Sequence, residues 1–521
     1  MSKAILAHDL GTTGNKASIY GENGTLLATK YCPYETYYPH ADYVEQNPAD
    51  WWDAICRSTR EVIEKAGVSN KDVCAVSFSG QMMALLPVSQ TGEILMDRAI
   101  IWADSRSVDE SAYIEQRLGW KRFYDITGGG MPIALYGVSK ALWIKNHYPA
   151  VYKNTYKFMS VKDAMIQRLT GHFCTEYSDA SNIGLLDIEK RCWSQEIIQA
   201  AGLDSAKLVE EIKPSTGIAG HITKAAASAT GLMEGTPVIC GGGDVPCAAL
   251  GAGIIREGNA YNCIGSASWF AVATRSPLID YDSRPFNICH VVPDMCVSQM
   301  ATFSAGVAHQ WVTQNLCDAE AMQSRESGEN VYAVYDAKAS KVPAGSNGVL
   351  FLPNMRPGGA PHNNLDDRGA FVGLKLSNTK DDMLRAVLEG VSFNIRIMCE
   401  DIEKKTGLRF SQVDFIGGGS RSEIWSNIQA SIMNREFRTL QLQQEANSFG
   451  AAMIAGVSLG IYPDFPAAAQ RFVKAGKVFR PHAADTAVYD RLYPIYKQLY
   501  DALSPINTQL KNVLPEEIRR V

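Results

Sequence analysis

The feature that most constrains the fold is a strand–turn–strand pattern that occurs twice along the chain. An apolar run, a turn of glycine and hydroxyl residues, and a second apolar run follow one another in residues 4–20 and again in residues 260–273. Each run has the length and composition of a short β-strand. Two similar openings of this kind predict a duplicated α/β unit with a cleft between its two halves.

Composition narrows the class of protein. The 521 residues are 46% hydrophobic and 20% charged, which is typical of a globular chain of two or three domains. The net charge is −5 and no basic block occurs, so we expect no nucleic-acid partner. No uncharged apolar run is long enough to span a bilayer, and the twelve cysteines form no Cys-x-x-Cys pair. We therefore expect a cytoplasmic protein with reduced thiols, no zinc site and no membrane partner.

The first turn is a candidate phosphate-binding site. Asp9 ends the apolar run 4–8, and Thr12 and Thr13 lie in the turn that follows. Backbone N–H groups and hydroxyls in such a turn can hold phosphate oxygens, and the carboxylate can hold Mg²⁺ through water. It is not a Walker loop, because no Gly-Lys-Ser/Thr follows and the turn leads to a strand. The alternative, a plain hairpin, leaves a carboxylate at the end of an apolar strand unexplained.

A second carboxylate follows three glycines. The apolar run 237–240 predicts a buried strand, and Gly241, Gly242 and Gly243 then precede Asp244. Glycines allow a ligand to approach the backbone closely, and the carboxylate suits a general base for a substrate hydroxyl. Taken alone, the segment fits a turn with a solvated aspartate equally well.

Trp102, Asp104 and Arg106 form a candidate sugar-binding wall, because an aromatic face and charged hydrogen-bonding groups suit a sugar. The spacing fits a core tryptophan and a surface ion pair just as well.

The second half contains a candidate nucleotide loop. Residues 413–416 predict a strand, the glycines 417–419 follow, and a helix begins near residue 424. A nucleotide can lie against the amides at such a helix start. Elsewhere, residues 175–181 predict a polar loop, and the tail from residue 468 is predicted to be helical.

Taken together, these residues resemble the FGGY carbohydrate kinases, and within them the xylulose kinases. The resemblance extends from about residue 5 to residue 460, and residues 369–389 match the C-terminal signature of the family. Further matches occur, in the same order as in the family, in residues 9–14, 45–52, 79–82, 99–102, 140–143, 241–244, 361–364 and 417–423.

The resemblance implies an α/β fold of two actin-like (ribonuclease H-like) ATPase domains flanking a cleft. Residues 1–254 would form the N-terminal domain, with the sugar site, the first phosphate turn and the catalytic aspartate. Residues 255–521 would form the C-terminal, nucleotide-binding domain with a peripheral helical tail. It also implies ATP and Mg²⁺, a small sugar or polyol as substrate, and a homodimer, as in many relatives.

The resemblance assigns roles to individual residues. Asp244 would be the general base, and Asp9 and Asp244 the metal ligands. ATP would contact Asp9, Thr12, Thr13, Gly265, Ser266, Gly418, Gly419 and Ser420. The sugar would contact Met82, Met83, Trp102, Asp104 and Asp244.

Four positions depart from the xylulose kinase pattern. Met83 replaces a histidine and Val245 an asparagine, Gly358 and Gly359 replace charged residues, and Ser266 stands where a threonine is usual in the second phosphate turn. The sequence therefore predicts ATP-dependent phosphorylation of a sugar hydroxyl, with a pentulose such as xylulose as substrate. Two alternatives stay open: a kinase for another polyol or an autoinducer-2-like ligand, and a non-catalytic sugar- or nucleotide-binding relative.

Overall fold

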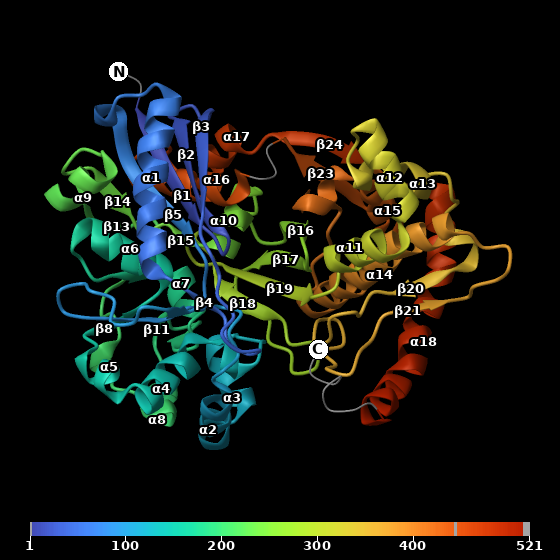
Figure 1. Cartoon of the computed structure of the whole chain (residues 1–521), viewed down its shortest axis with the longest axis horizontal. Coiled ribbons are helices and arrows are strands. Elements are labelled where there is room, and N and C mark those ends of the chain that lie inside the picture. Colours follow the sequence, from blue (N-terminus) through green and yellow to red (C-terminus); the bar gives the residue numbers. More distant parts are fainter. Residues whose placement is uncertain (1–2, 442–444, 514–521) are drawn as a thin grey trace.

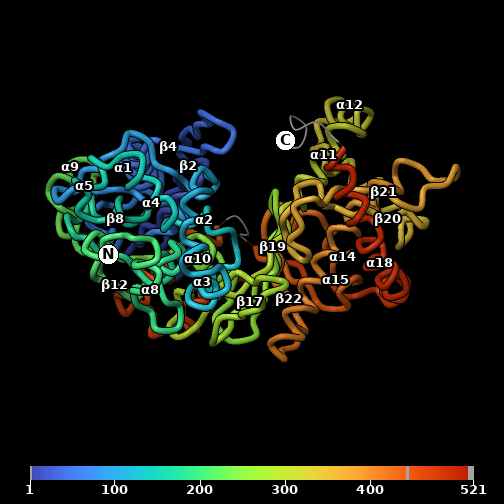
Figure 2. The backbone as a smooth tube through the Cα atoms, turned by 90° about the horizontal axis from the view of Figure 1, so that it is seen from below, coloured from blue at the N-terminus to red at the C-terminus, as the bar shows by residue number. Residues whose placement is uncertain are grey.

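The computed structural model describes residues 3–441 and 445–513. The chain forms two lobes, one made mainly of the first half of the sequence and the other of the second half (Figure 2). Each lobe is built around a seven-stranded mixed sheet (Figure 1).

The first sheet has the order β13-β14-β5-β1-β2-β3, and β15 also pairs with β5. Its strands are β1 (Ala4–Leu10), β2 (Gly14–Gly21), β3 (Leu26–Pro33), β5 (Val73–Gly80), β13 (Ile218–His221), β14 (Pro237–Ile239) and β15 (Gly242–Gly243).

The second sheet has the order β18-β19-β17-β16-β22-β23-β24. Its strands are β16 (Ala260–Ile264), β17 (Ser268–Thr274), β18 (Phe286–Cys289), β19 (Cys296–Thr302), β22 (Gln412–Ile416), β23 (Glu436–Leu440) and β24 (Ala475–Phe479).

The two sheets share one topology. In each, the first strand (β1 or β16) pairs antiparallel with the next strand and parallel with the strand that enters after a long crossover (β5 or β22). A second parallel strand (β14 or β23) and then an antiparallel edge strand (β13 or β24) follow in space. The duplicated α/β unit predicted from the two strand–turn–strand segments is therefore confirmed.

Helices cover both faces of the first sheet. Helix α1 (Pro48–Ala66) lies over β2 and β3. It begins where the Asn47 side chain accepts a hydrogen bond from the amide of Ala49, and it buries Trp51 and Val62 against the strands. Helix α16 (Ala446–Ser458) covers β1 and β5 on the other face, followed by α17 (Phe465–Phe472). A segment late in the sequence thus completes the core of the first lobe.

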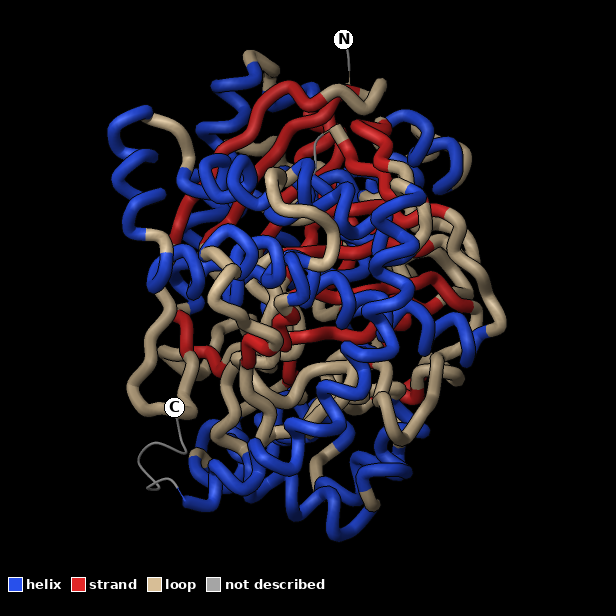
Figure 3. The backbone as a smooth tube through the Cα atoms, turned by 90° about the vertical axis from the view of Figure 1, so that its right-hand side faces the viewer, coloured by secondary structure: helices blue, strands red, loops and turns tan. Residues whose placement is uncertain are grey.

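Two long helices stabilise the second lobe. In the view of Figure 3, helices lie in front of many of the strands. Helix α14 (Lys380–Thr406) begins with a capping box between Thr379 and Asp382. Helix α18 (Ala483–Val513) lies in the tail that was predicted to be helical and peripheral. The tail is not peripheral, because α18 buries Tyr489 and Tyr496 in the core of this lobe, and it is not all helical, because it contains β24. Helices α11 (Gly306–Leu316), α12 (Asp318–Ser327), α13 (Val331–Ala339) and α15 (Glu423–Met433) complete the layer.

The lobes meet where α10 (Asp244–Gly251) crosses α16. The backbones touch at two glycines. A Cβ added to Gly251 would lie 1.8 Å from the carbonyl oxygen of Ala446, and one added to Gly450 would lie 2.1 Å from that of Cys247. Only glycine permits this approach. Because α10 starts at Asp244, this contact couples the position of that carboxylate to the second half of the chain.

The remaining helices of the first lobe are α2 (Val108–Leu118), α3 (Trp120–Thr127), α4 (Gly137–His147), α5 (Pro149–Asn154), α6 (Val161–Thr170), α7 (Tyr177–Ser181), α8 (Gln195–Ala201) and α9 (Lys224–Thr230). The expected polar loop at residues 175–181 is wrong: it contains β9 (Thr175–Glu176) and α7, and Glu176 caps the helix. Its polar residues are buried because they bond to one another and to Lys162. No described helix has the length and apolar composition of a membrane span.

Candidate active site

Sheet register brings the two predicted carboxylates to one edge of the first sheet. Asp9 of β1 and Gly242 of β15 both lie opposite Ser79 of the central strand β5. Two strand spacings separate them, about 10 Å between their Cα atoms. Asp244 is two residues beyond Gly242 and begins α10. Asp9 and Asp244 therefore share the same end of the sheet.

Asp9 is fixed from both halves of the chain. Its Oδ1 accepts hydrogen bonds from Ser79 Oγ at 3.2 Å and from Asn447 Nδ2 of α16 at 3.1 Å. Burial raises the pKa of Asp9, while the charge of Lys16 on β2 opposes this shift. Lys16 also forms a 3.3 Å ion pair with Glu445.

Asp244 has the electrostatic setting of a general base. Burial, and then the charge of Asp9, raise the pKa of Asp244 to about 7. A carboxylate with this pKa can accept a proton near neutral pH. Its Oδ1 already accepts a 2.8 Å hydrogen bond from the amide of Val245.

The two carboxylates also fit a divalent cation. The charge of Asp9 raises the pKa of Asp244 by like-charge repulsion, which a cation between the two carboxylates would relieve. Mg²⁺ commonly takes one or two carboxylates and completes its shell with phosphate oxygens and water. Within the described residues no group of three or more His, Cys, Asp or Glu is placed to hold a metal. The remaining oxygens of an Mg²⁺ shell would therefore come from phosphate and solvent.

The predicted phosphate turn contacts the predicted sugar wall. Trp102 Nε1 donates a 2.9 Å hydrogen bond to Thr12 Oγ1, and the indole is 43% exposed. Thr13 is held from its other side by the Tyr31 hydroxyl, which donates to its carbonyl oxygen at 2.7 Å. Thr12 and Trp102, 90 residues apart, thus line the same region.

Met82 and Met83 lie beside the glycine segment. A Cβ added to Gly243 would lie 2.3 Å from Met82 Sδ, so the thioether packs directly on that backbone. Met83 has a positive φ of 64°, which non-glycine residues rarely adopt. The buried Lys140 Nζ donates to the carbonyl of Met83 at 3.0 Å and to that of Ile101 at 2.8 Å. Lys140 thereby ties the methionine segment to the segment that carries Trp102.

Asp104 has a different setting from the one expected of a sugar ligand. It is fully buried, and its oxygens accept hydrogen bonds from the amide of Val44 at 2.6 Å and from Arg106 Nε at 2.9 Å. Arg106 also pairs with Glu45 at 2.7 Å and lies over the Tyr43 ring. In this conformation both oxygens of Asp104 are used within the protein. Its predicted sugar contact stays a prediction.

The second lobe contains a cavity of about 510 Å³ at the corresponding edge of its sheet. The second turn and the glycine loop both open into it, through Gly265, Ser266, Gly418 and Gly419. Ser420 does not line the cavity: it is buried, and its hydroxyl donates to the carbonyl of Gly417 at 2.7 Å. Four of the five residues predicted for ATP in this lobe therefore share one cavity.

Other residues of this cavity were not predicted from any sequence motif. His309 and Gln310 of α11 and Tyr332 and Asp336 of α13 also line it. Among the described residues, Asp336 Oδ1 and His309 Nε2 are buried without a hydrogen-bond partner, which makes both available to a ligand. Burial raises the pKa of Asp336 to about 6. No motif marks these helices, and only the fold brings them to the glycine loops.

The glycine segment before Asp244 is supported by a buried ionic network. The amide of Gly243 donates to Ser178 Oγ at 2.9 Å, and Ser178 Oγ donates to Glu176 at 2.6 Å. Lys162 is fully buried and pairs with Asp163 at 2.6 Å, and lies 3.6 Å from Glu176. Burial alone would lower the pKa of Lys162, but the charges of Asp163, Asp179 and Glu176 outweigh it and keep that pKa well above its usual value.

Comparison with known proteins assigns the chain to a protein family. The N- and C-terminal domains of the FGGY family of carbohydrate kinases match residues 4–251 and 260–459. The xylulose kinase of Bacillus subtilis (strain 168) is 30% identical, over 98% of this chain and 99% of the relative. The autoinducer-2 kinase of Enterobacter sp. (strain 638) is 27% identical, over 97% and 96%. The crystal structure of ligand-bound xylulose kinase from Lactobacillus acidophilus has a TM-score of 0.87 and 25% identity, over 98% of this chain and 100% of that chain. The chain therefore belongs to the FGGY family of carbohydrate kinases and is a phosphotransferase that acts on a small-molecule sugar.

Proposed function

We propose that this kinase transfers the γ-phosphoryl group of ATP to a hydroxyl of a pentulose such as xylulose. The observation that carries the proposal is the pairing of Asp244 with Asp9 at one edge of the first sheet, with the pKa of Asp244 near 7. The 30% identity to a xylulose kinase along nearly the whole chain supports the substrate class.

In the proposed reaction the sugar lies beside Met82, Met83 and Trp102. Its hydroxyl gives its proton to Asp244 while its oxygen forms a bond to the γ-phosphorus. The bond between that phosphorus and the β–γ bridging oxygen breaks, and ADP leaves. Thr12, Thr13 and the amides of the first turn hold the phosphoryl oxygens, which spread charge in the transition state. Asp9 and Asp244 would hold Mg²⁺, whose role when bound is to neutralise phosphate charge.

ATP would be held by the second lobe. The cavity lined by Gly265, Ser266, Gly418 and Gly419 lies at the sheet edge that corresponds to the phosphate turn of the first lobe. Residues 1–254 and 255–521 are proposed as the sugar-side and nucleotide-side domains, with α16 and α17 returning to pack on the first sheet. Approach of the lobes would exclude water, which otherwise competes with the sugar as acceptor.

One observation favours a second candidate substrate. Met83 and Val245 are apolar where xylulose kinases carry a histidine and an asparagine, and an autoinducer-2 kinase is 27% identical. Val245 packs against the core cluster that includes Met82 and Met83, so the wall beside Asp244 has few polar atoms. A polyol with fewer hydroxyls, or an autoinducer-2-like ligand, would suit such a wall.

The test is sugar-dependent ADP release from MgATP across ketoses, aldoses, polyols and the autoinducer-2 precursor, with a no-sugar control. We expect one strong response, from a pentulose, and none from the Asp244→Asn variant. A strong response only to the autoinducer-2 precursor would select the second candidate. ATP and sugar binding by calorimetry without any ADP release would contradict catalysis and indicate a binding protein.

A further inference from the structure

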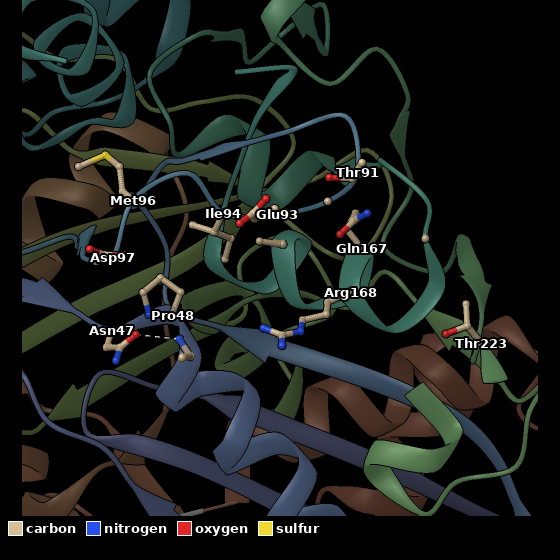
Figure 4. A pocket seen from close by; sticks show the side chains of 14 residues that line it. Asn47, Pro48, Thr91, Glu93, Ile94, Met96, Asp97, Gln167, Arg168 and Thr223 are labelled. Atoms are coloured by element: carbon tan, nitrogen blue, oxygen red, sulfur yellow. Dashed lines mark hydrogen bonds between the residues drawn. The ribbon is translucent and has the colours of Figure 1, made fainter. Parts of the chain in front are cut away.

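A second cavity, of about 550 Å³, lies in the first lobe away from every residue predicted to contact sugar or nucleotide (Figure 4). Three segments enclose it: the start of α1, the hairpin at residues 89–97, and the C-terminal half of α6. Its polar lining includes Asn47, Thr91, Glu93, Asp97, Gln167 and Arg168.

Gln167 lines this cavity with a side-chain amide. The residue is 5% exposed, and within residues 3–441 and 445–513 its side chain makes no hydrogen bond. It packs against Gly92, where an added Cβ would lie 2.2 Å from Gln167 Nε2. Neither amide atom is fully buried, so both can be reached from the cavity. An amide in this position can donate to a ligand and accept from it.

Arg168 is a cation without an anion. Its guanidinium lies 4.5 Å from the centroid of the Trp52 ring, and in the described part of the chain it forms no ion pair. Arg168 is an exposed residue, and partial burial of its guanidinium lowers its pKa. The stacked ring restrains the guanidinium, which leaves its N–H edge for a bidentate contact with an anionic group.

The opposite wall of the cavity suits hydroxyl groups. Glu93 and Asp97 belong to the hairpin, are exposed, and pair with no cation among the described residues. Their oxygens, with the Thr91 hydroxyl, accept hydrogen bonds from hydroxyls and would repel a second anionic group. The cavity thus presents one unpaired cation, one unpaired amide and several acceptors, in a volume typical of small-molecule sites.

We propose that this cavity is a second ligand site, which binds a sugar carrying one anionic group, either a phosphate or a carboxylate. Arg168 contacts the anionic group, Gln167 and Thr91 bond to the sugar, and Glu93 accepts from its hydroxyls. The site is separate from the phosphotransfer centre, so it can be filled while the kinase turns over.

Hydrogen–deuterium exchange on the full chain tests this, because it locates binding. The probes are ribose 5-phosphate, gluconate, ribose and inorganic phosphate, and the reporters are the peptides over residues 89–97 and 164–171. We expect ribose 5-phosphate or gluconate to protect both peptides, and whichever is stronger identifies the anionic group. Ribose and inorganic phosphate should protect at least tenfold more weakly, because each has only half of the required groups.

Variants make the test specific. Arg168→Gln and Gln167→Leu should each weaken protection of residues 89–97 at least tenfold, with sugar kinase activity unchanged. Arg57→Gln, on the same lobe but outside the cavity, should change neither. Unaltered melting temperatures confirm that the variants fold. Because Arg168→Gln and Gln167→Leu change the same helix, either variant alone can test the proposal if the other does not fold. Absence of protection by both anionic sugars, equal protection by ribose, or equal protection in Arg168→Gln would overturn the proposal.

Discussion

The backbone amide of Gly243 donates a 2.9 Å hydrogen bond to the hydroxyl of Ser178, 65 residues earlier in the chain. The Ser178 hydroxyl in turn donates a hydrogen bond to Glu176, which lies 3.6 Å from the buried ammonium of Lys162. The residue directly before Asp244 is therefore held by an ionic network in the core. The strand–glycine segment alone would leave it mobile, since glycine has the greatest backbone freedom.

Removal of the Ser178 hydroxyl should disturb catalysis more than binding. Ser178→Ala leaves the buried amide of Gly243 without an acceptor, which costs about 1–3 kcal/mol of unfolding free energy. We expect kcat to fall roughly tenfold or more, because small displacements of a catalytic group are costly. Denaturant unfolding and steady-state kinetics measure the two effects.

Ser215→Ala is the matched control for this network. The Ser215 hydroxyl donates to the same carboxylate, Glu176, at 2.9 Å but does not contact Gly243. The Ser215→Ala variant should lose unfolding free energy with little change in kcat. Equal losses of kcat in both variants would show that the hydrogen bond to Gly243 has no specific effect on catalysis.

The pH dependence of the reaction should report Asp244. Burial and the charge of Asp9 raise the pKa of Asp244 to about 7, and a general base works only when ionised. As the pH falls below about 7, log kcat/KM should fall with a slope approaching one, and it should level off above. The profile is measured from pH 5.5 to 8.5 with melting temperatures as a control for unfolding. A flat profile across that range contradicts the assignment of Asp244 as the base.

The close contact between α10 and α16 should not tolerate a side chain at Gly450. The Cβ in Gly450→Ala would lie 2.1 Å from the backbone oxygen of Cys247, so the helices must separate. Overpacking of this kind costs about 1–3 kcal/mol. It should also lower kcat, because α10 carries Asp244 and α16 carries Asn447, which bonds to Asp9.

Ser458→Ala, in the last turn of α16, is the control for helix composition and should leave both quantities unchanged. Thermal unfolding and kcat are measured together. A Gly450→Ala variant with the stability and turnover of the parent chain would show that the helices are not in the close contact described.

Replacement of Lys140 should raise KM for the sugar without raising KM for ATP. The buried amino group of Lys140, whose pKa burial lowers to about 7, donates to the carbonyls of Met83 and Ile101, next to Trp102. Lys140→Met keeps most of the side-chain volume but removes both bonds, so KM for the sugar should rise about tenfold or more, the cost of one to two hydrogen bonds. KM for ATP should stay within about twofold. Equal increases in both constants would indicate general destabilisation instead.

Local patterns predicted much of the fold. The apolar runs at residues 4–20 and 260–273 became the first two strands of each sheet. These features depend on neighbouring residues only. The pairing of β1 with β5, which brings Asp9 beside Ser79, joins residues 70 positions apart and was not predicted from the sequence.

Features that depend on distant residues could not be predicted in this way. Residues 175–181 have the composition of a loop, because no sequence pattern shows that Glu176 and Asp179 meet Lys162 in the core. His309 and Asp336 carry no motif, and only the packing of α11 and α13 brings them to the nucleotide cavity. The return of α16 to the first sheet is equally invisible, since its partners on β1 and β5 lie more than 360 residues earlier.

The most direct test of the central claim is single-turnover transfer of phosphate from ATP to xylulose by the parent chain and by Asp244→Asn, with sugar binding measured by calorimetry. The amide keeps the size of the carboxyl group but cannot accept the proton. We predict a fall in the transfer rate of about 10²–10⁴-fold, the usual contribution of a general base, with sugar affinity changed by less than about fivefold. A variant that transfers phosphate within tenfold of the parent rate would contradict the assignment of Asp244 as the base.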